Sequence, residues 1–227
     1  MIRGLRLALT IAGKDLRLEG RTFQRLISMA AFALLAGILF HYALESLSGR
    51  SPVLVSGLVW VTVLFAGVLG IGRSYQMESE NDALEGLLLT PVSPVSIYVG
   101  KVLANYVLVI LVAAFTVVVL GLFFSVSFIA LPGTFYLLLA MGTLGLVAVG
   151  TIFSAVTARS SMGETLMPVL LFPLLVPVVV FGAGATGRIV AGLPPSEAAG
   201  SVRLMGAYVI VGLFAGILVA DSAVRDI

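Results

Sequence analysis

The chain has 227 residues, of which 60% are hydrophobic and only 11% are charged, and its formal net charge is +2. Soluble domains carry about 25% charged residues, so this composition excludes an ordinary soluble protein and predicts an all-α, polytopic membrane protein. The sequence contains no cysteine, which excludes disulfides, iron–sulfur clusters and thiolate metal sites on this chain. No basic patch is interleaved with aromatic residues, so nucleic-acid binding is not expected.

Residues 1–25 are predicted to form an amphipathic helix on the cytoplasmic side of the membrane. At 100° per residue, one side is basic and polar and a second side is apolar. The polar side consists of Arg3, Arg6, Thr10, Lys14, Arg17, Arg21 and Gln24, and the apolar side of Ile2, Leu5, Leu9, Ala12, Leu16 and Phe23. This pattern is typical of a helix in the membrane interface that faces anionic headgroups, and packing on a partner protein is the alternative. Asp15 and Glu19 flank the apolar side, where they could pair with basic neighbours or with that partner.

Six apolar segments follow within 26–227, and each is long enough to cross a bilayer as a helix. They cover about 26–44, 53–72, 97–124, 134–157, 165–183 and 203–221. If the N-terminus lies inside, ten Lys and Arg residues fall in cytoplasmic regions and three fall outside. The positive-inside rule therefore predicts that both termini are cytoplasmic.

The connector 73–96, between the second and third spans, is acidic and too elaborate for a simple turn. Its acids are Glu78, Glu80, Asp82 and Glu85, and its apolar stripe contains Leu84, Leu87 and Leu88. Prolines then interrupt the helical pattern, and Ser96 is predicted to cap the third span. We interpret the connector as a docking surface for a soluble partner, with a solvated loop as the alternative.

The last three spans contain residues that shape helices. Glycines in the fourth and sixth spans allow close helix packing. The fifth span contains Pro168, Pro173 and Pro177, each of which removes a backbone hydrogen bond. We expect this helix to be kinked or partly unwound, to lie inside the bundle or at a dimer interface, and to move as a gate. The glycine-rich residues 182–201 are predicted to form an external or re-entrant pair of short helices, with Ser196 capping the sixth span.

The sequence lacks the chemistry of a self-contained transporter or enzyme. No acidic or basic residue lies at the centre of a span, which argues against ion-coupled transport. Neither Gly-Lys pair has the other residues of a Walker A motif, so the energy for transport would come from a separate subunit. His41, the only histidine, is a candidate axial haem ligand, and pairing with Glu45 is the alternative. No metal site is predicted.

Several motifs together resemble the haem exporter protein B family (cytochrome c maturation protein B), the permease subunit of an ABC-2-like transporter. They are KDLRLE at 14–19, GLVWVTVLFAGVLGIGRS at 57–74, ESENDALEGLLLTPVS at 78–93, YVGKVLANY at 98–106, GTLGLVAVGTIFSAV at 142–156 and LMPVLLFPLLVP at 166–177. The resemblance extends from Lys14 to about Pro177.

The resemblance implies a bacterial inner-membrane complex of two copies of this chain with two copies of a cytoplasmic ABC ATPase. A haem-handling membrane protein and a small accessory subunit would join the complex. ATP hydrolysis would be linked to the release of a haem-loaded periplasmic chaperone, with ATP bound by the partner, haem as possible cargo and no cofactor on this chain. Residues matching the family's ATPase-facing connector are Glu78, Glu80, Asp82, Glu85, Gly86, Leu87 and Leu88. Two alternatives are an ABC-2 exporter of a lipid, drug or polysaccharide, and a non-transporting assembly scaffold.

Overall fold

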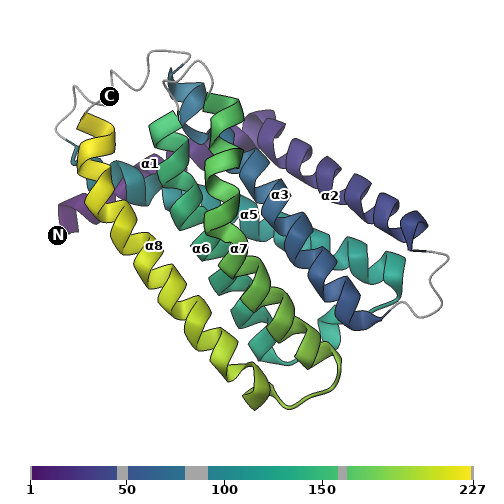
Figure 1. Cartoon of the computed structure of the whole chain (residues 1–227). Coiled ribbons are helices and arrows are strands. Elements are labelled where there is room, and N and C mark those ends of the chain that lie inside the picture. The colour runs from purple at the N-terminus through teal and green to yellow at the C-terminus, as the bar shows by residue number, and fades with distance from the viewer. Residues whose placement is uncertain (1, 45–50, 80–91, 158–162, 226–227) are drawn as a thin grey trace.

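The computed structural model describes residues 2–44, 51–79, 92–157 and 163–225. All regular secondary structure in these residues is helical (Figure 1). The α-helices are α1 (Ile2–Thr22), α2 (Gln24–Ala43), α3 (Pro52–Ser79), α5 (Pro94–Phe124), α6 (Gly133–Thr157), α7 (Gly163–Val190) and α8 (Ala199–Arg225). Two short 3₁₀ helices are η1 (Phe128–Ala130) and η2 (Pro195–Ala198).

Among the described residues, six helices are long and apolar enough to cross a membrane, namely α2, α3, α5, α6, α7 and α8. This confirms the predicted all-α membrane fold with six spans. The spans form a bundle, and α1 crosses the end of the bundle at which α8 finishes (Figure 1). We call this end the α1 end. The beginnings of α2, α5 and α7 and the last turns of α3, α6 and α8 also lie there.

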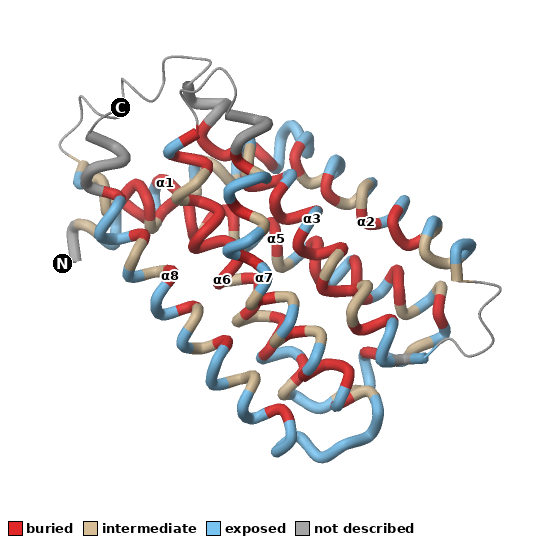
Figure 2. The backbone as a smooth tube through the Cα atoms, viewed as in Figure 1, coloured by how far each residue is buried: buried red, intermediate tan, exposed pale blue. Residues whose placement is uncertain are grey.

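The interior of the bundle is built around α3, which packs against α2, α5, α6 and α7. Buried positions run along the inner faces of these helices, whereas α2 and α8 expose apolar residues along most of their length (Figure 2). Exposed leucines such as Leu35, Leu39 and Leu218 are ordinary on a surface that faces lipid, because burial from water is supplied by the bilayer.

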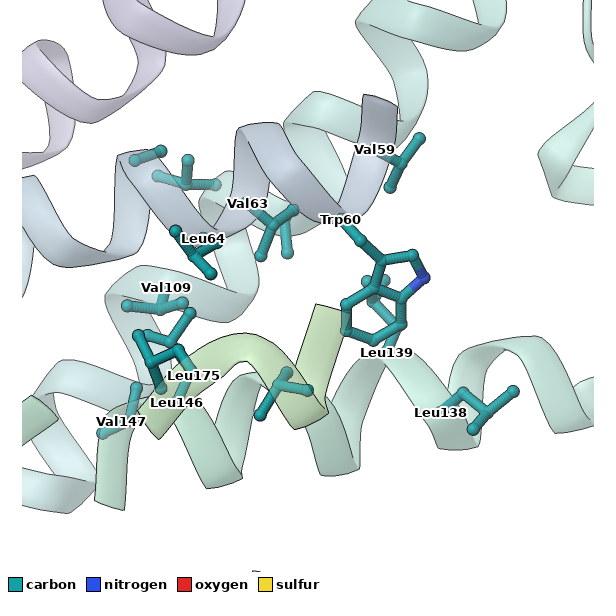
Figure 3. Packing of buried hydrophobic residues seen from close by; sticks show 14 of the residues in the cluster. Val59, Trp60, Val63, Leu64, Val109, Leu138, Leu139, Leu146, Val147 and Leu175 are labelled. Atoms are coloured by element: carbon teal, nitrogen blue, oxygen red, sulfur yellow. The ribbon is translucent and has the colours of Figure 1, made fainter. Parts of the chain in front are cut away.

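Trp60 of α3 is the largest side chain in the core and is almost fully buried (Figure 3). Its Nε1 donates a hydrogen bond to Oγ1 of Thr186 on α7, at 3.0 Å. A Cβ atom at Gly142 of α6 or at Gly182 of α7 would collide with the indole ring. The ring therefore occupies the space that two glycines leave open, which is how small residues let membrane helices approach closely.

The prediction of short external helices over residues 182–201 was wrong in its first half. The glycine-rich stretch continues α7 as one helix to Val190, followed by η2 and by α8 from Ala199. Tertiary packing explains the difference, since Gly182 and Thr186 accommodate Trp60 while Gly187 lies against Val53. Ser196 lies within η2 and not at the start of α8.

The helices that bound the connector extend further than the apolar pattern indicated. α3 continues to Ser79, and α5 begins at Pro94. The cap of α5 is Ser93 and not Ser96, because the Ser93 Oγ accepts a hydrogen bond from the Ser96 amide at 3.3 Å. Proline at the first helical position suits this arrangement, since it has no N–H to satisfy.

Candidate functional site

A buried lysine joins the two helices that flank the connector. Lys101 of α5 is only 2% exposed, and its Nζ donates a hydrogen bond to the Ser74 carbonyl of α3 at 2.9 Å. The same ammonium lies 3.0 Å from Oδ2 of Asp15 on α1 and 5.2 Å from the centroid of the Tyr75 ring. One side chain therefore fastens α1, α3 and α5 together. We call Asp15, Ser74 and Lys101 the clasp.

The clasp excludes most water but keeps its charges paired. Asp15 has 10% of its side chain exposed, and its other oxygen lies 3.2 Å from Nζ of the half-exposed Lys14. A buried ammonium is strongly unfavourable unless a counter-charge and hydrogen-bond acceptors surround it. Lys101 has the Asp15 carboxylate as counter-charge and the Ser74 carbonyl as acceptor. Because Asp15 belongs to α1, burial of the lysine is favourable only while α1 stays in place.

A second polar cluster lies next to the clasp and reaches deeper into the bundle. Arg25 of α2 donates from Nε to the Gly70 carbonyl of α3 at 2.8 Å and from Nη2 to Oδ1 of Asn105 at 2.6 Å. Asn105 of α5 then donates from Nδ2 to Oγ1 of Thr151 on α6, at 3.1 Å. This cluster joins α2, α3, α5 and α6 through hydrogen bonds made within the protein, which are favoured where the dielectric constant is low.

The corner between α1 and α2 is held by Glu19. Phe23 adopts a left-handed conformation with φ of 51°, and α2 begins immediately after it. The buried Glu19 accepts a hydrogen bond at Oε1 from the Leu26 amide at 2.9 Å. A carboxylate at this position satisfies one of the free N–H groups in the first turn of α2 and complements the helix dipole. The backbone strain at Phe23 is therefore offset by a cap supplied from α1.

The exposure of residues on α1 differs from what the sequence pattern indicated. Ala8 and Ile11 are buried together with Glu19 on the side that meets the bundle, where Asp15 is partly buried. Leu5 and Leu9, which were assigned to the apolar side, are more than half exposed. Asp15 pairs with Lys101, and Glu19 lies near Arg25. Of the two predicted alternatives, the structure therefore has the acids beside basic residues of the same chain.

The predicted docking residues cannot be compared with the structure. Glu80, Asp82, Leu84, Glu85, Gly86, Leu87 and Leu88 lie outside the described residues, as does the side chain of Glu78 at the end of α3. The structure does describe how the flanking helices are held together.

The sequence did not predict that Lys101, Asn105 and Arg25 are buried and lie close together. The sequence signal was the i, i+4 spacing of Lys101 and Asn105, which places both on one face of a very apolar helix.

The three prolines lie inside one continuous helix, α7. Of the two predicted forms, the partly unwound one is not seen, and the kinked one stays a prediction. Pro168 and Pro177 are partly buried, whereas Pro173 is exposed. The Tyr208 hydroxyl of α8 donates to the Leu174 carbonyl at 2.9 Å, between two of the prolines. Proline has no N–H, so Pro177 leaves the carbonyl of Pro173 without its helical donor, and not the carbonyl of Leu174. The Tyr208 bond is therefore an added contact between α7 and α8.

His41 lies at the end of the bundle opposite α1 and packs among aromatic rings. Its ring centroid is 5.6 Å from that of Phe123 and 5.9 Å from that of Phe124. The buried Nδ1 has no hydrogen-bond partner among the described residues, and Glu45 lies outside them. Within the described part of the chain, no three His, Cys, Asp or Glu side chains are placed to hold a metal ion.

Comparison with known proteins identifies the family. A model of the CcmB protein family matches residues 6–226. The chain belongs to this family. The match confirms the resemblance noted from the sequence and spans the clasp, the second polar cluster and all six spans of this CcmB-family chain.

Curated relatives support the same assignment along most of the chain. Heme exporter protein B of Paracoccus denitrificans is 30% identical over 82% of this chain and 84% of the relative. The protein of the same name from Pseudomonas aeruginosa is 28% identical over 82% and 83%. That of Bradyrhizobium diazoefficiens is 26% identical over 93% and 94%. The match to the CcmB family model thus extends well beyond the proline-containing span.

Proposed function

We propose that this chain is the membrane-spanning subunit of a haem exporter in the bacterial inner membrane. The name of its curated relatives and the six apolar helices support this proposal. The sequence contains no Walker A motif, so ATP is hydrolysed by a separate ABC ATPase and not by this permease chain. Both termini and the α1 end face the cytoplasm, in keeping with the excess of Lys and Arg there.

The observation that carries the coupling proposal is the clasp. A cytoplasmic ATPase would bind the acids and leucines of the connector, which continues directly from α3 and leads into α5. Lys101 joins α5 to α3 through the Ser74 carbonyl, so a displacement of the connector reaches both helices at once. A simple surface loop needs no buried lysine at its base.

The output of the cycle is proposed to be cytochrome c maturation. Two copies of this chain would assemble with two ATPase subunits, a haem-handling membrane protein and a small accessory subunit. ATP hydrolysis would drive haem export or release the haem-loaded periplasmic chaperone. Haem is cargo in this scheme, and His41 is the candidate contact because its Nδ1 is buried among aromatic rings without a partner in the described residues.

The cargo is tested by deleting the chain in a strain that makes c-type cytochromes. Loss of these cytochromes with normal haem synthesis is expected. Normal cytochrome levels would instead favour export of another hydrophobic cargo. In a strain whose ATPase is inactivated at its Walker motif, continued maturation would favour a non-transporting scaffold.

Docking is tested by co-purification of the ATPase with the chain. Glu85→Lys and Leu88→Asp are expected to abolish co-purification, because they reverse a charge and bury a carboxylate in the contact. Arg203→Gln, an exposed change at the opposite end of the bundle, serves as the control. Retention of the ATPase by both connector variants would contradict the docking site.

The haem contact is tested with His41→Gln. This variant is expected to lower the level of c-type cytochromes if His41 touches haem, whereas an unchanged level would contradict that contact.

A further inference from the structure

We infer that α1 is a coupling arm, which Asp15 and Lys101 fasten to both connector-flanking helices so that α1, the end of α3 and the start of α5 move as one body. This inference rests on the proposed function, since the ATPase supplies the movement. It assigns to Asp15 a positioning role in coupling, separate from the docking role of the connector.

The contact between α1 and α5 is close along two helical turns. A Cβ atom at Gly100 would lie 2.8 Å from the Ala8 carbonyl oxygen and 2.9 Å from Cβ of Ile11. A Cβ atom at Gly4 would lie 3.3 Å from Oγ of Ser96. The absence of a side chain at Gly100 therefore lets the two backbones touch just before Lys101, and the ion pair extends the contact on the same side.

The ionic part of this contact fixes a position that apolar packing alone would not. Small and apolar side chains such as Ala8 and Ile11 tolerate sliding, because their attraction has no direction. Lys101 must keep both the Asp15 carboxylate and the Ser74 carbonyl within hydrogen-bonding distance. Any shift of α1 along α5 would separate a buried ammonium from its counter-charge, and buried polar groups are best attested in such register-fixing roles.

The movement of α1 also has a route into the rest of the bundle. Glu19 of α1 accepts a hydrogen bond from the first turn of α2 across the corner at Phe23, so the angle between α1 and α2 is held by this bond. Arg25, in the first turn of α2, then contacts the Gly70 carbonyl and Asn105. The clasp thus binds α1 to the bundle directly, and the second polar cluster binds α2, to which Glu19 joins α1.

The functional test uses Asp15→Asn and Lys101→Met, with Lys14→Gln as the matched control. Lys14 also pairs with Asp15, but half of its side chain is exposed. All levels are normalised to the amount of chain in the membrane, because loss of a buried charge partner lowers stability. In the two clasp variants, the amount of ATPase co-purified per chain is expected to stay near the wild-type ratio. The level of c-type cytochromes is expected to fall at least about fivefold, the lower end of typical coupling effects. Wild-type cytochrome levels in both variants would overturn the inference.

A covalent tether tests the one-body movement even if a clasp variant folds poorly. The chain has no cysteine, so Gly4→Cys combined with Ser96→Cys introduces a single pair at a contact the structure shows to be close. In the purified complex with its ATPase, oxidation of the pair is expected to leave ATP hydrolysis within about twofold of the reduced form, well below the fivefold that marks even a weak coupling effect. A loss of hydrolysis on oxidation that is reversed by reductant would show that α1 must slide on α5, and would overturn the inference.

The two proposals fail in different ways. If cytochrome maturation continues with an inactive ATPase, the proposed function is wrong whatever the clasp variants do. If maturation requires the ATPase but Asp15→Asn and Lys101→Met are fully active, only the coupling arm is wrong. If these variants lose the ATPase itself, the clasp belongs to the docking surface and the positioning role of Asp15 is wrong.

Discussion

The indole of Trp60 and the hydroxyl of Thr186 are joined by a 3.0 Å hydrogen bond in the interior of the bundle. Without that acceptor the indole N–H would be buried with no partner, since the ring is surrounded by hydrocarbon. The same ring fills the space beside Gly142 and Gly182, so one residue of α3 sets the distance to both α6 and α7.

Gly182→Ala is expected to destabilise the chain by about 1–3 kcal/mol, because the added methyl group overlaps the Trp60 ring in a close-packed core. Thermal unfolding in detergent measures the effect. Gly184→Ala on the same helix is the control, since nothing lies within 4 Å of an added Cβ there. Equal stability of the two variants would contradict the packing described for Trp60.

Asp15→Leu and Lys101→Met are each expected to lower the free energy of unfolding by about 3 kcal/mol, since each removes one member of a buried ion pair. The double variant is expected to lose much less than the sum, because it leaves neither charge without its partner. Additive losses in this cycle would show that the two residues act separately. Lys14→Gln is expected to change stability by less than about 1 kcal/mol, as exposed pairs do.

Arg25→Lys is expected to destabilise the chain although it keeps the positive charge. The guanidinium reaches the Gly70 carbonyl and the Asn105 side chain with two separate nitrogens, and a single ammonium does not reproduce that geometry. The cost is expected to be about 1–3 kcal/mol, the cost of leaving a buried polar group unsatisfied. Arg21→Lys on the exposed side of α1 is the control, and an equal effect there would contradict the specific role of Arg25.

Replacing Pro173 and Pro177 by alanine tests the predicted gate. Alanine restores backbone N–H groups inside α7, so the variant is expected to be as stable as wild type or more stable. If the prolines allow α7 to move, the level of c-type cytochromes is expected to fall while the amount of chain and of bound ATPase is unchanged. Normal maturation in this variant would remove the gating role.

The sequence predicted those features that depend on local pattern. Long apolar runs identified the six spans, and the periodicity of residues 2–24 predicted an amphipathic helix where the structure has α1. It predicted separate short helices after the fifth span and did not predict that Gly182 to Val190 continue α7, because this depends on Trp60, far away in the sequence, lying against the glycines. Local propensity counts glycine as a helix breaker, and only the packing shows why it is needed here.

The clasp shows the same limit for charged residues. Asp15 and Lys101 each resemble residues at the edge of a membrane-facing segment, and nothing in either local sequence indicates that they meet. Their pairing follows from the path of α1 across the end of the bundle, beside α5 (Figure 1). The connector acids and leucines remain predictions, since they lie outside the described residues.

The corner at Phe23 has a consequence for the order in which the chain is built. The bond from the Leu26 amide to Glu19 joins residues close in sequence, so it can form as soon as α2 leaves the ribosome. Asp15 must wait for Lys101, which is synthesised only after α3 and the connector. During that interval α1 would rest on the membrane surface, already angled against α2, with its acidic face uncovered. The arrival of α5 would then complete the site, so a nascent chain that stops before α5 is expected to expose that face to quality-control proteases.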